Sequence, residues 1–312
     1  MIPVAIIPRR RKNTDKVKIY RGKALRKFIL SADAGCDLPS ELTKKYDVKI
    51  LPINFLVDGE EYSSDDGRMS MPLLFEKMRA GAKTATFQPN PTSAEEYFEN
   101  LLSCGYDVLH LSMSHQMSGT YETLEKLSQT INAKSRNKLY VVDTLSQGAG
   151  FGLIAIMTAQ KSDEADWDAA SAKEYAENLR LNVSHEFTVD SLTFLANGGR
   201  ISRHLAAIGN LLKIKPVLGV DDDGKIIVRK KIIGRKRALD DMAARVTGNY
   251  SDLSDTIFVS ESDCKEDAEY LKAKINEKLP SAKVEILPLG PVMVCHCGPG
   301  VVAVFYTATS RK

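Results

Sequence analysis

The stretch Asp107-Val-Leu-His-Leu-Ser-Met-Ser-His-Gln-Met-Ser-Gly-Thr-Tyr121 carries more information about the fold than any other part of this chain. Its first half contains a short apolar run bounded by polar residues, which predicts a buried β-strand over Val108–Met113. The chain then crosses the small residues Ser118–Thr120, and a helix is expected from Tyr121 onwards. A strand followed by a helix is the repeating unit of an α/β protein.

The residues between this strand and this helix have the composition of an anion-binding site. The first N–H groups of a helix lack intrahelical partners, and the helix dipole is positive there. Gly119 lets a ligand approach the backbone, while Ser114 and Ser118 offer hydroxyl groups. The alternative is that Ser118 only caps the helix and binds no ligand.

Length and composition narrow the class of protein. A chain of 312 residues is long enough for two domains. Hydrophobic residues make up 43% and charged residues 27%, and the mean hydropathy is −0.21, as in soluble globular proteins. No segment approaches the roughly 18 apolar residues that propose a membrane span. The five cysteines are odd in number and scattered, which favours a reducing cytoplasm over a disulfide framework.

The net charge of +3 is unevenly distributed. Residues 1–27 hold ten Lys or Arg and one acid, whereas the rest of the chain holds 33 basic and 39 acidic residues. The body is therefore mildly acidic, and no specific nucleic-acid partner is expected. We interpret residues 1–27 as a disordered or appended leader, whose Arg9–Lys12 run could make at most transient contact with a membrane surface. Arg229–Arg237 is the basic cluster of the body, and it suits a solvated connection or a docking patch for an acidic partner.

Apolar periodicity in the first half predicts alternating strands and helices. The expected strands are Lys27–Ser31, Val48–Leu56, Val108–Met113 and Leu139–Asp143, and the expected helices are Glu41–Tyr46, Met71–Ala80, Ala94–Cys104, Tyr121–Asn132 and Gly148–Gln160. Val57–Glu60 is expected to form a turn and Thr84–Thr92 a Pro-rich loop. This alternation predicts an N-terminal α/β domain over residues 28–183, with a parallel sheet flanked by helices. Ligands of such sheets bind beyond the carboxyl ends of the strands.

The pattern changes after a helix expected over Asp168–Asn182. The expected strands of the second half are Phe187–Leu192, Lys215–Val220, Lys225–Ile233, Thr256–Ser260, Lys283–Leu287 and Val301–Thr307, and the expected helices are Lys236–Val246 and Lys265–Lys278. Asp221–Gly224 is typical of a hairpin turn. These elements predict a C-terminal α+β domain with a mixed sheet over residues 184–312.

Other short islands of Gly, Pro, Ser, Thr or isolated charge follow apolar runs. They are Asp33–Pro39, Thr84–Pro91, Asn197–Ser202 and Cys295–Gly300. Each also has a purely structural explanation, such as a turn, a surface cation or a buried structural histidine. Cys295-His-Cys297 offers ligand types that suit zinc, but adjacent residues do not easily close a tetrahedron, so no metal is expected. Gly148–Gly152 departs from the dinucleotide fingerprint, and the chain has no P-loop, kinase or G-x-S-x-G motif, so no cofactor is expected.

Taken in order, these islands resemble the DegV family, the fatty-acid-binding subunits of bacterial fatty acid kinase. Thr86-Phe-Gln-Pro89 resembles the family's Thr-Ser-Gln-Pro loop, and Ser114–Tyr121 is similar to its Ser-Ser-x-Leu-Ser-Gly-Thr-Tyr signature. Further matches are Val142–Thr144, Gly148–Gly152, Leu195–Ser202, Lys213–Leu218 and His296–Gly300. The likeness runs from about Phe28 to Thr307. It departs from the family pattern at Ala34, His115, Cys295 and Cys297.

The resemblance implies that a long-chain fatty acid lies between the two domains, with its tail in an apolar tunnel. It assigns carboxylate binding to Thr86, to Ser118 or Ser114, to Gly119 and to His296. It also places Arg200 and His296 near the head group, where they would support phosphoryl transfer. Which serine is the direct ligand stays open, although Ser118 suits the helix start better.

The resemblance also implies a partner. An ATP-dependent kinase subunit would phosphorylate the bound acid to an acyl phosphate, so this chain would be a lipid-binding subunit without catalytic residues of its own. The alternative function is an enzyme that acts on a small phosphorylated or carboxylated metabolite at the Ser118–Thr120 helix start. The preferred fatty acid, the oligomeric state and the role of residues 1–27 are left open.

Overall fold

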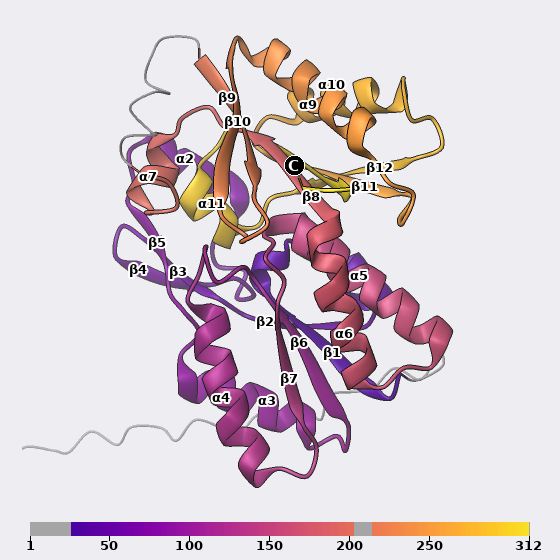
Figure 1. The fold of residues 1–312 in the computed structure, drawn as a ribbon. Coiled ribbons are helices and arrows are strands. Elements are labelled where there is room, and N and C mark those ends of the chain that lie inside the picture. Colours follow the sequence, from indigo (N-terminus) through magenta and orange to yellow (C-terminus); the bar gives the residue numbers. More distant parts are fainter. Residues whose placement is uncertain (1–25, 203–213, 312) are drawn as a thin grey trace, which may run out of the picture.

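The computed structural model describes residues 26–202 and 214–311 (Figure 1). Its first half is built on a parallel sheet, as expected, whose four strands lie in the order β2-β1-β6-β7. These strands are β1 (Phe28–Asp33), β2 (Val48–Leu51), β6 (Asp107–Ser112) and β7 (Leu139–Asp143). The expected bounds of β7 are confirmed, and the others differ by a few residues.

Helices cover both faces of this sheet. The helices are α3 (Pro91–Leu102) and α4 (Thr120–Lys134) on one face, and α5 (Gly148–Ala165) and α6 (Ala169–Leu179) on the other (Figure 1). Successive residues of a strand point to opposite faces. Val108 of β6 therefore packs in the cluster of α3 and α4, whereas Leu109 packs in the cluster of α5. Both clusters are apolar, so each strand of the sheet is buried on two sides.

A small antiparallel sheet projects from this half, and it corrects two expectations. Its strands are β3 (Asn54–Val57), β4 (Glu60–Ser63) and β5 (Thr84–Thr86), in the order β4-β3-β5. We expected one strand over Val48–Leu56, but it breaks after Leu51 because Pro52 has no N–H for a sheet ladder. We also expected a loop at Thr84–Thr86, which instead pairs with β3. With only three residues, β5 is too short for an alternation of apolar and polar side chains to be recognised in the sequence.

The second half contains a mixed sheet, as expected, whose six strands lie in the order β10-β9-β8-β13-β11-β12. Its strands are β8 (Val183–Thr188), β9 (Ile214–Val220), β10 (Ile226–Ile233), β11 (Thr256–Ser262), β12 (Lys283–Pro288) and β13 (Val301–Thr307). β11 and β12 are parallel, and the other pairs are antiparallel. Helices α9 (Arg235–Asn249) and α10 (Lys265–Asn276) cover one face, at the top of Figure 1.

Three elements of this half differ from the expected ones. β8 begins at Val183, not at Phe187, and all of its residues are buried even though they include His185 and Glu186. Two short helices were not expected, α7 (Thr193–Asn197) and α11 (Pro291–Cys297). They contain five and seven residues, which is too short for a clear helical period.

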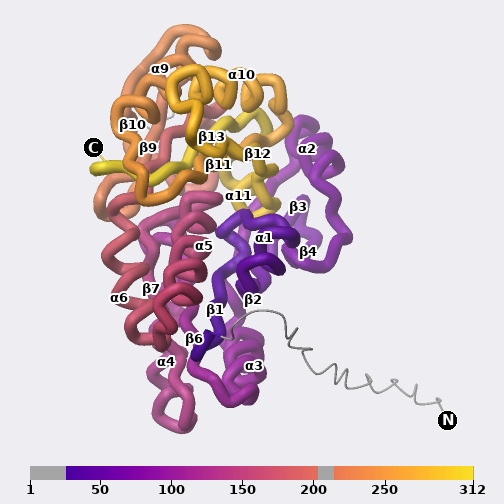
Figure 2. The backbone as a smooth tube through the Cα atoms, turned by 90° about the vertical axis from the view of Figure 1, so that its right-hand side faces the viewer, coloured from indigo at the N-terminus to yellow at the C-terminus, as the bar shows by residue number. Residues whose placement is uncertain are grey.

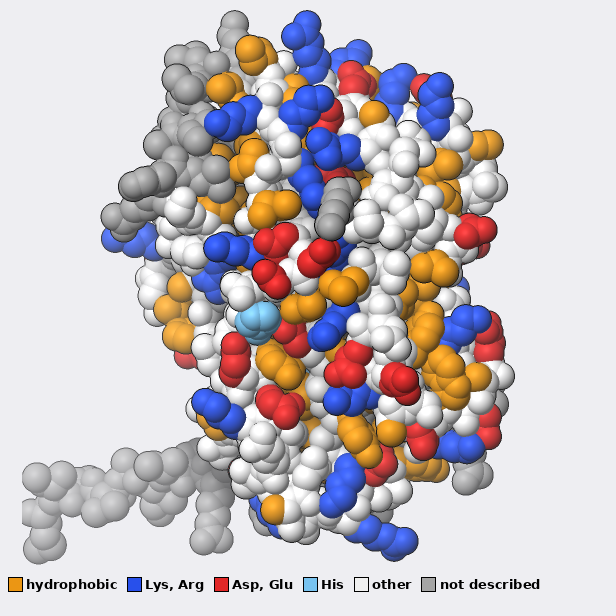
Figure 3. Space-filling view, in the orientation of Figure 1, with side chains coloured by type: hydrophobic (Ala, Val, Ile, Leu, Met, Phe, Trp, Pro, Cys, Tyr) orange, Lys and Arg blue, Asp and Glu red, His pale blue; other side chains and the backbone are white. Residues whose placement is uncertain are grey.

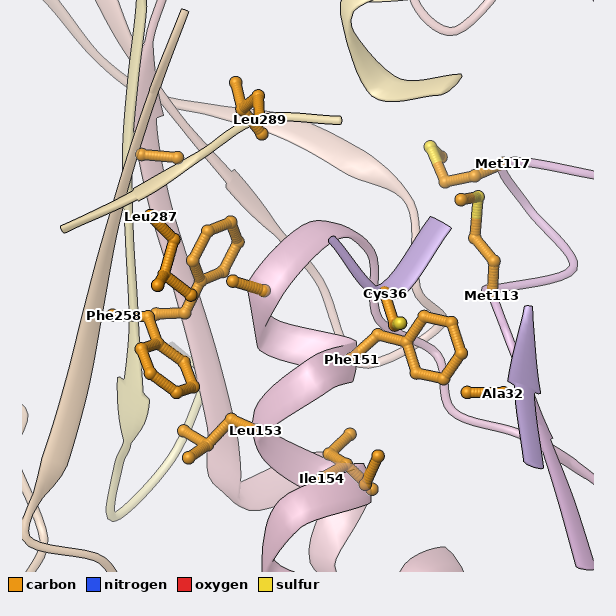
Figure 4. Packing of buried hydrophobic residues seen from close by; sticks show 14 of the residues in the cluster. Ala32, Cys36, Met113, Met117, Phe151, Leu153, Ile154, Phe258, Leu287 and Leu289 are labelled. Carbon is orange, nitrogen blue, oxygen red and sulfur yellow. The ribbon is translucent and has the colours of Figure 1, made fainter. Parts of the chain in front are cut away.

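Helix α5 connects the two sheets. In Figure 4 its side chains Phe151, Leu153 and Ile154 lie between Ala32 and neighbouring residues of the first half and Phe258 of the second. Figure 2 shows the same arrangement from the side, with α5 below the mixed sheet. One apolar cluster contains residues of both halves, so packing alone does not separate two domains. The division of the chain into two domains near Asn182–His185 therefore stays a prediction.

Residues 1–25, which include Arg9–Lys12, lie outside the described residues. Arg26 already belongs to the folded part, since its guanidinium lies 3.0 Å from a carboxylate oxygen of Asp163. Among residues 26–202 and 214–311, no helix combines the length and apolar character that crossing a bilayer requires.

The basic cluster Arg229–Arg237 is partly neutralised within the protein. Arg229 lies 3.6 Å from Glu186, Lys230 lies 2.5 Å from Asp241, and Arg235 lies 2.8 Å from Asp267. On the face seen in Figure 3, basic side chains gather at the top with a few acidic ones among them, and the two kinds are interspersed lower down. The ion pairs within Arg229–Arg237 reduce the positive charge that this cluster can offer to a nucleic acid.

Arg311 ties several segments of the fold together. Its guanidinium is buried, with the residue 2% exposed, and burial lowers its pKa to about 10. It donates hydrogen bonds to the carbonyl oxygens of Arg180, Leu145 (2.7 Å), Val183 (3.0 Å) and Asp221 (3.1 Å), and to the hydroxyl of Ser146 (3.0 Å). These acceptors come from both halves of the chain.

Replacement of Arg311 by methionine should destabilise the protein strongly. The variant keeps most of the side-chain volume but leaves several buried carbonyl groups without donors. We expect the free energy of unfolding to fall by about 3 kcal/mol, measured by urea denaturation. Arg136→Met, at an exposed position, is the matched control. Equal losses in the two variants would contradict a tying role for Arg311.

Candidate functional site

A cavity lies between the parallel sheet and the mixed sheet. The space within it, including solvent at its opening, is about 810 Å³. Most of its lining is apolar and comes from both halves of the chain. The apolar residues of the lining are Ile53, Phe87, Met113, Met117, Phe187, Leu195, Ile226, Leu289, Val292, Met293, Val301, Ala303 and Phe305. Figure 4 shows Met113, Met117 and Leu289 around α5.

A group of polar side chains lines the same cavity. Its members are Thr86, Ser118, Thr120, Arg200 and His296. The hydroxyl of Thr86 hydrogen-bonds Nε2 of His296 at 2.7 Å, and the hydroxyls of Ser118 and Thr120 hydrogen-bond each other at 2.7 Å. The structure thus brings together residues that lie up to 210 positions apart in the chain. Four of the five were expected at the head group, and Thr120 was named only within the Ser118–Thr120 helix start of the alternative function.

Strand β5 positions helix α11 and thereby His296. Thr84 and Thr86 are two residues apart on β5, so their side chains lie on one face of the strand. Thr84 donates its hydroxyl hydrogen to the carbonyl oxygen of Cys295 (2.7 Å), next to the Thr86–His296 bond. At the other end of α11, the N–H of Gly290 donates to Oδ1 of Asp37 (3.1 Å). The helix is therefore held at both ends by the first half of the chain.

The turn after α7 positions Arg200. Gly199 has φ +73°, a conformation that glycine adopts without strain. A Cβ atom on Gly198 would lie 2.7 Å from Nδ1 of His296, so only glycine lets the imidazole approach so closely. Arg200 donates from Nε to the carbonyl oxygen of Met117 (3.0 Å) and from its terminal nitrogen to that of Gly198. The guanidinium therefore bridges the turn and the segment before Ser118.

Ser114 and Gly119 occupy different surroundings from Ser118. Ser114 is fully buried, lies outside the residues that line the cavity, and donates its hydroxyl hydrogen to the carbonyl oxygen of Gly224 (2.9 Å). Gly119 precedes the first residue of α4, but the side-chain amide of Gln88 lies directly over it. Gln88 in turn accepts a hydrogen bond from Thr123 (2.8 Å). Of the two candidate serines, Ser118 is the one that faces the cavity.

Within the polar group, Arg200 carries a positive charge whereas His296 is neutral. Burial, and then the nearby Arg200, lower the pKa of His296 to about 4, so its imidazole is neutral at neutral pH. Burial also lowers the pKa of Arg200 from its ordinary value, but a guanidinium stays charged. Among the described residues of the lining, the one acidic residue is Asp33, whose pKa burial raises to about 6. A cation beside a neutral imidazole and several hydroxyls suits an anionic head group.

Comparison with known proteins places the chain in a family. The family model described as "Uncharacterised protein, DegV family" matches residues 27–309. The chain belongs to the DegV family. A DegV domain-containing protein of Clostridium perfringens is 34% identical over 292 residues, covering 92% of this chain and 100% of that protein. A DegV domain-containing protein of Streptococcus pyogenes is 31% identical over 287 residues, covering 91% and 99%.

Solved structures of DegV proteins have the same fold. A DegV family protein of Thermus thermophilus is 26% identical with a TM-score of 0.78, covering 91% of this chain and 100% of that one. A DegV family protein of Streptococcus agalactiae is also 26% identical, with a TM-score of 0.79 and coverages of 92% and 100%. The arrangement of a parallel sheet and a mixed sheet is therefore a shared feature of this DegV protein and its relatives.

The low pKa of His296 should make the stability of this DegV protein depend on pH. An unfolded histidine has a pKa of about 6.5. Between about pH 6.5 and about pH 4 the unfolded chain therefore binds more protons at this position, and stability falls as the pH falls. In His296→Gln this contribution is absent, so stability should decline less across this window, by up to about 1.4 kcal/mol per pH unit. Urea denaturation of ligand-free protein at stepped pH measures it, and equal slopes for the two proteins would refute the assignment.

Proposed function

We propose that this DegV protein binds a long-chain fatty acid in the cavity between its sheets. The observation that carries the proposal is that Thr86, Ser118, Arg200 and His296 all line one cavity whose remaining lining is mostly apolar. A fatty acid has the same division, with one anionic end and a long apolar tail. The related proteins of Thermus thermophilus and Streptococcus agalactiae are described as fatty acid binding, which supports the proposal.

Burial of the tail supplies most of the affinity in this proposal. Each CH₂ group removed from water contributes roughly 0.8 kcal/mol. The methionines and phenylalanines of the lining offer the apolar surface, and the unbranched Met113, Met117 and Met293 can adapt to the shape of a chain. The polar group then fixes which end of the ligand lies where.

The carboxylate is proposed to lie between the hydroxyls of Thr86 and Ser118, with Arg200 and His296 beside it. In the ligand-free protein these hydroxyls bond His296 and Thr120. A hydroxyl hydrogen rotates freely about its C–O bond, so both can turn toward an anion without moving the backbone. Ser118 is preferred to Ser114 because the Ser114 hydroxyl is fully buried and bonded to Gly224. Gly119 does not line the cavity and lies under the Gln88 amide, so it has no direct contact with the carboxylate in this proposal.

We further propose that the protein presents the bound acid to an ATP-dependent kinase subunit in the cytoplasm, which forms the acyl phosphate. The chain lacks a P-loop and the kinase motifs, so phosphoryl transfer is assigned to the partner. Arg200 can stabilise the negative charge that the incoming phosphoryl group brings to the head group, while the bond to ADP breaks and ADP leaves with the partner. The alternative, a metabolite enzyme at the start of α4, is disfavoured because Gln88 covers Gly119.

Loss of the head-group hydroxyls should weaken ligand retention. Protein purified from a bacterial host should release fatty acid on denaturation, detected by mass spectrometry. Thr86→Val and Ser118→Ala should each weaken binding by about 1–3 kcal/mol, because a carboxylate hydrogen bond is lost. Thr92→Val and Ser93→Ala, at exposed positions of α3, are the matched controls. Wild-type protein that carries no fatty acid and binds none when oleate is added would refute the proposal.

Substitution of Arg200 or His296 should slow phosphoryl transfer to the bound fatty acid without releasing the fatty acid. Tail burial holds the ligand, so Arg200→Ala and His296→Ala should keep most of the bound acid. With a fatty acid kinase subunit and ATP, both variants should form acyl phosphate more slowly than wild type, by about tenfold or more. Hydroxamate trapping of the product measures the rate. Wild-type rates at equal ligand occupancy would remove both residues from the transfer step.

A further inference from the structure

A second polar position lies within the apolar part of the cavity. Gln147 lines the cavity and is only 7% exposed, yet its side-chain amide hydrogen-bonds no described residue. It occupies the N-cap position of α5 without a side-chain capping bond, and its backbone N–H donates to Nε2 of His185 (3.4 Å). Buried amides nearly always have partners, so a free one facing a cavity calls for a ligand group.

Asp33 shows what an already satisfied polar group in the same lining looks like. Its carboxylate accepts hydrogen bonds from the N–H groups of Gly35 (2.9 Å) and Met113 (2.9 Å) and from the hydroxyl of Ser112 (3.1 Å). These three bonds fix it to the protein. Gln147 is therefore the position with both donor and acceptor capacity to offer a ligand.

The length of α11 gives the distance between Gln147 and the head-group residue His296. The Asp37 carboxylate bonds Gly290 at the start of α11, and its other oxygen lies 3.5 Å from where a Cβ on Gly148 would stand. Gly148 and its neighbour Gln147 therefore lie at the start of α11, whereas His296 lies near its end. Seven helical residues span roughly 9 Å, so the two polar positions are separated by about that length.

Strand β13 gives a second measure of the same separation. Val301, Ala303 and Phe305 all line the cavity from one face of this strand. Phe305 lies 3.2 Å from the Cβ position on Gly148, and Val301 stands four residues earlier, shortly after His296. Four strand residues cover about 13 Å. Gln147 therefore faces the middle of a long acyl chain whose carboxylate lies at Thr86 and His296.

We propose that the Gln147 amide binds a hydroxyl group in the middle of the acyl chain, so that the preferred ligand is a long-chain hydroxy fatty acid. This rests on the proposed fatty-acid function. A hydroxyl both donates and accepts, as the amide does. Water is a poorer partner, because a buried water needs two to four polar contacts, and the ring of Phe305, which lies beside Gly148, offers none.

The experiment is a competition between stearate and stearate that carries a hydroxyl on its tenth carbon, on delipidated protein. Wild type should prefer the hydroxylated acid by about tenfold, because a plain chain leaves the amide unpaired. A hydroxyl on the third carbon should give no such advantage, since it lies near the head group. In Gln147→Leu and Gln147→Met the preference should vanish or reverse, with stearate binding retained.

Gln129→Leu is the matched control, because Gln129 is exposed on α4 and should keep the wild-type preference. Stearate binding reports on folding of every variant. Wild type that binds both acids equally, or a preference that survives in both Gln147 variants, would overturn the assignment of Gln147 while leaving fatty-acid binding intact. Wild type that binds neither acid would overturn the proposed function and this inference together.

Discussion

The cavity depends on hydrogen bonds that join β5 to α11. Thr84 bonds the carbonyl oxygen of Cys295 and Thr86 bonds the imidazole of His296, each at 2.7 Å. A helix of seven residues has little stability of its own, so its position is set by such tertiary contacts. α11 supplies four residues to the lining, so the small sheet of the first half positions one wall of a cavity to which the mixed sheet also contributes. The head-group geometry follows from the same contacts.

The bounds of an element were predicted best where the sequence contains one clear apolar run. The strands Leu139–Asp143 and Val301–Thr307 were predicted with their observed bounds, because each is a compact apolar run between polar residues. β8 was misplaced because His185 and Glu186 make a fully buried strand look amphipathic. Their burial is explained by partners far away in the chain, since Glu186 lies 3.6 Å from Arg229. No local pattern contains that information.

The site was predictable in its residues but not in their roles. Motif order alone brought Thr86, Ser118, Arg200 and His296 to attention, and all four line one cavity. The sequence could not separate Ser118 from Ser114, because the partner of Ser114 is the carbonyl of Gly224, 110 positions later. Gln147 belongs to no motif. Its proposed role in ligand binding rests only on its burial and on its unpaired side-chain amide. A motif can be recognised from neighbouring residues in the sequence, whereas the hydrogen-bond partner of a buried polar group depends on the whole fold.

The place of β13 in the mixed sheet affects when the cavity can exist. This strand lies between β8 and β11, although it follows both in the chain. Domains fold as they leave the ribosome, N-terminal parts first, so the parallel sheet can form while the rest is still being made. The mixed sheet has a gap at its centre until Val301–Thr307 has emerged. A ligand can therefore be enclosed only after translation has passed this strand, so the cavity becomes able to hold a ligand late in the synthesis of residues 26–311.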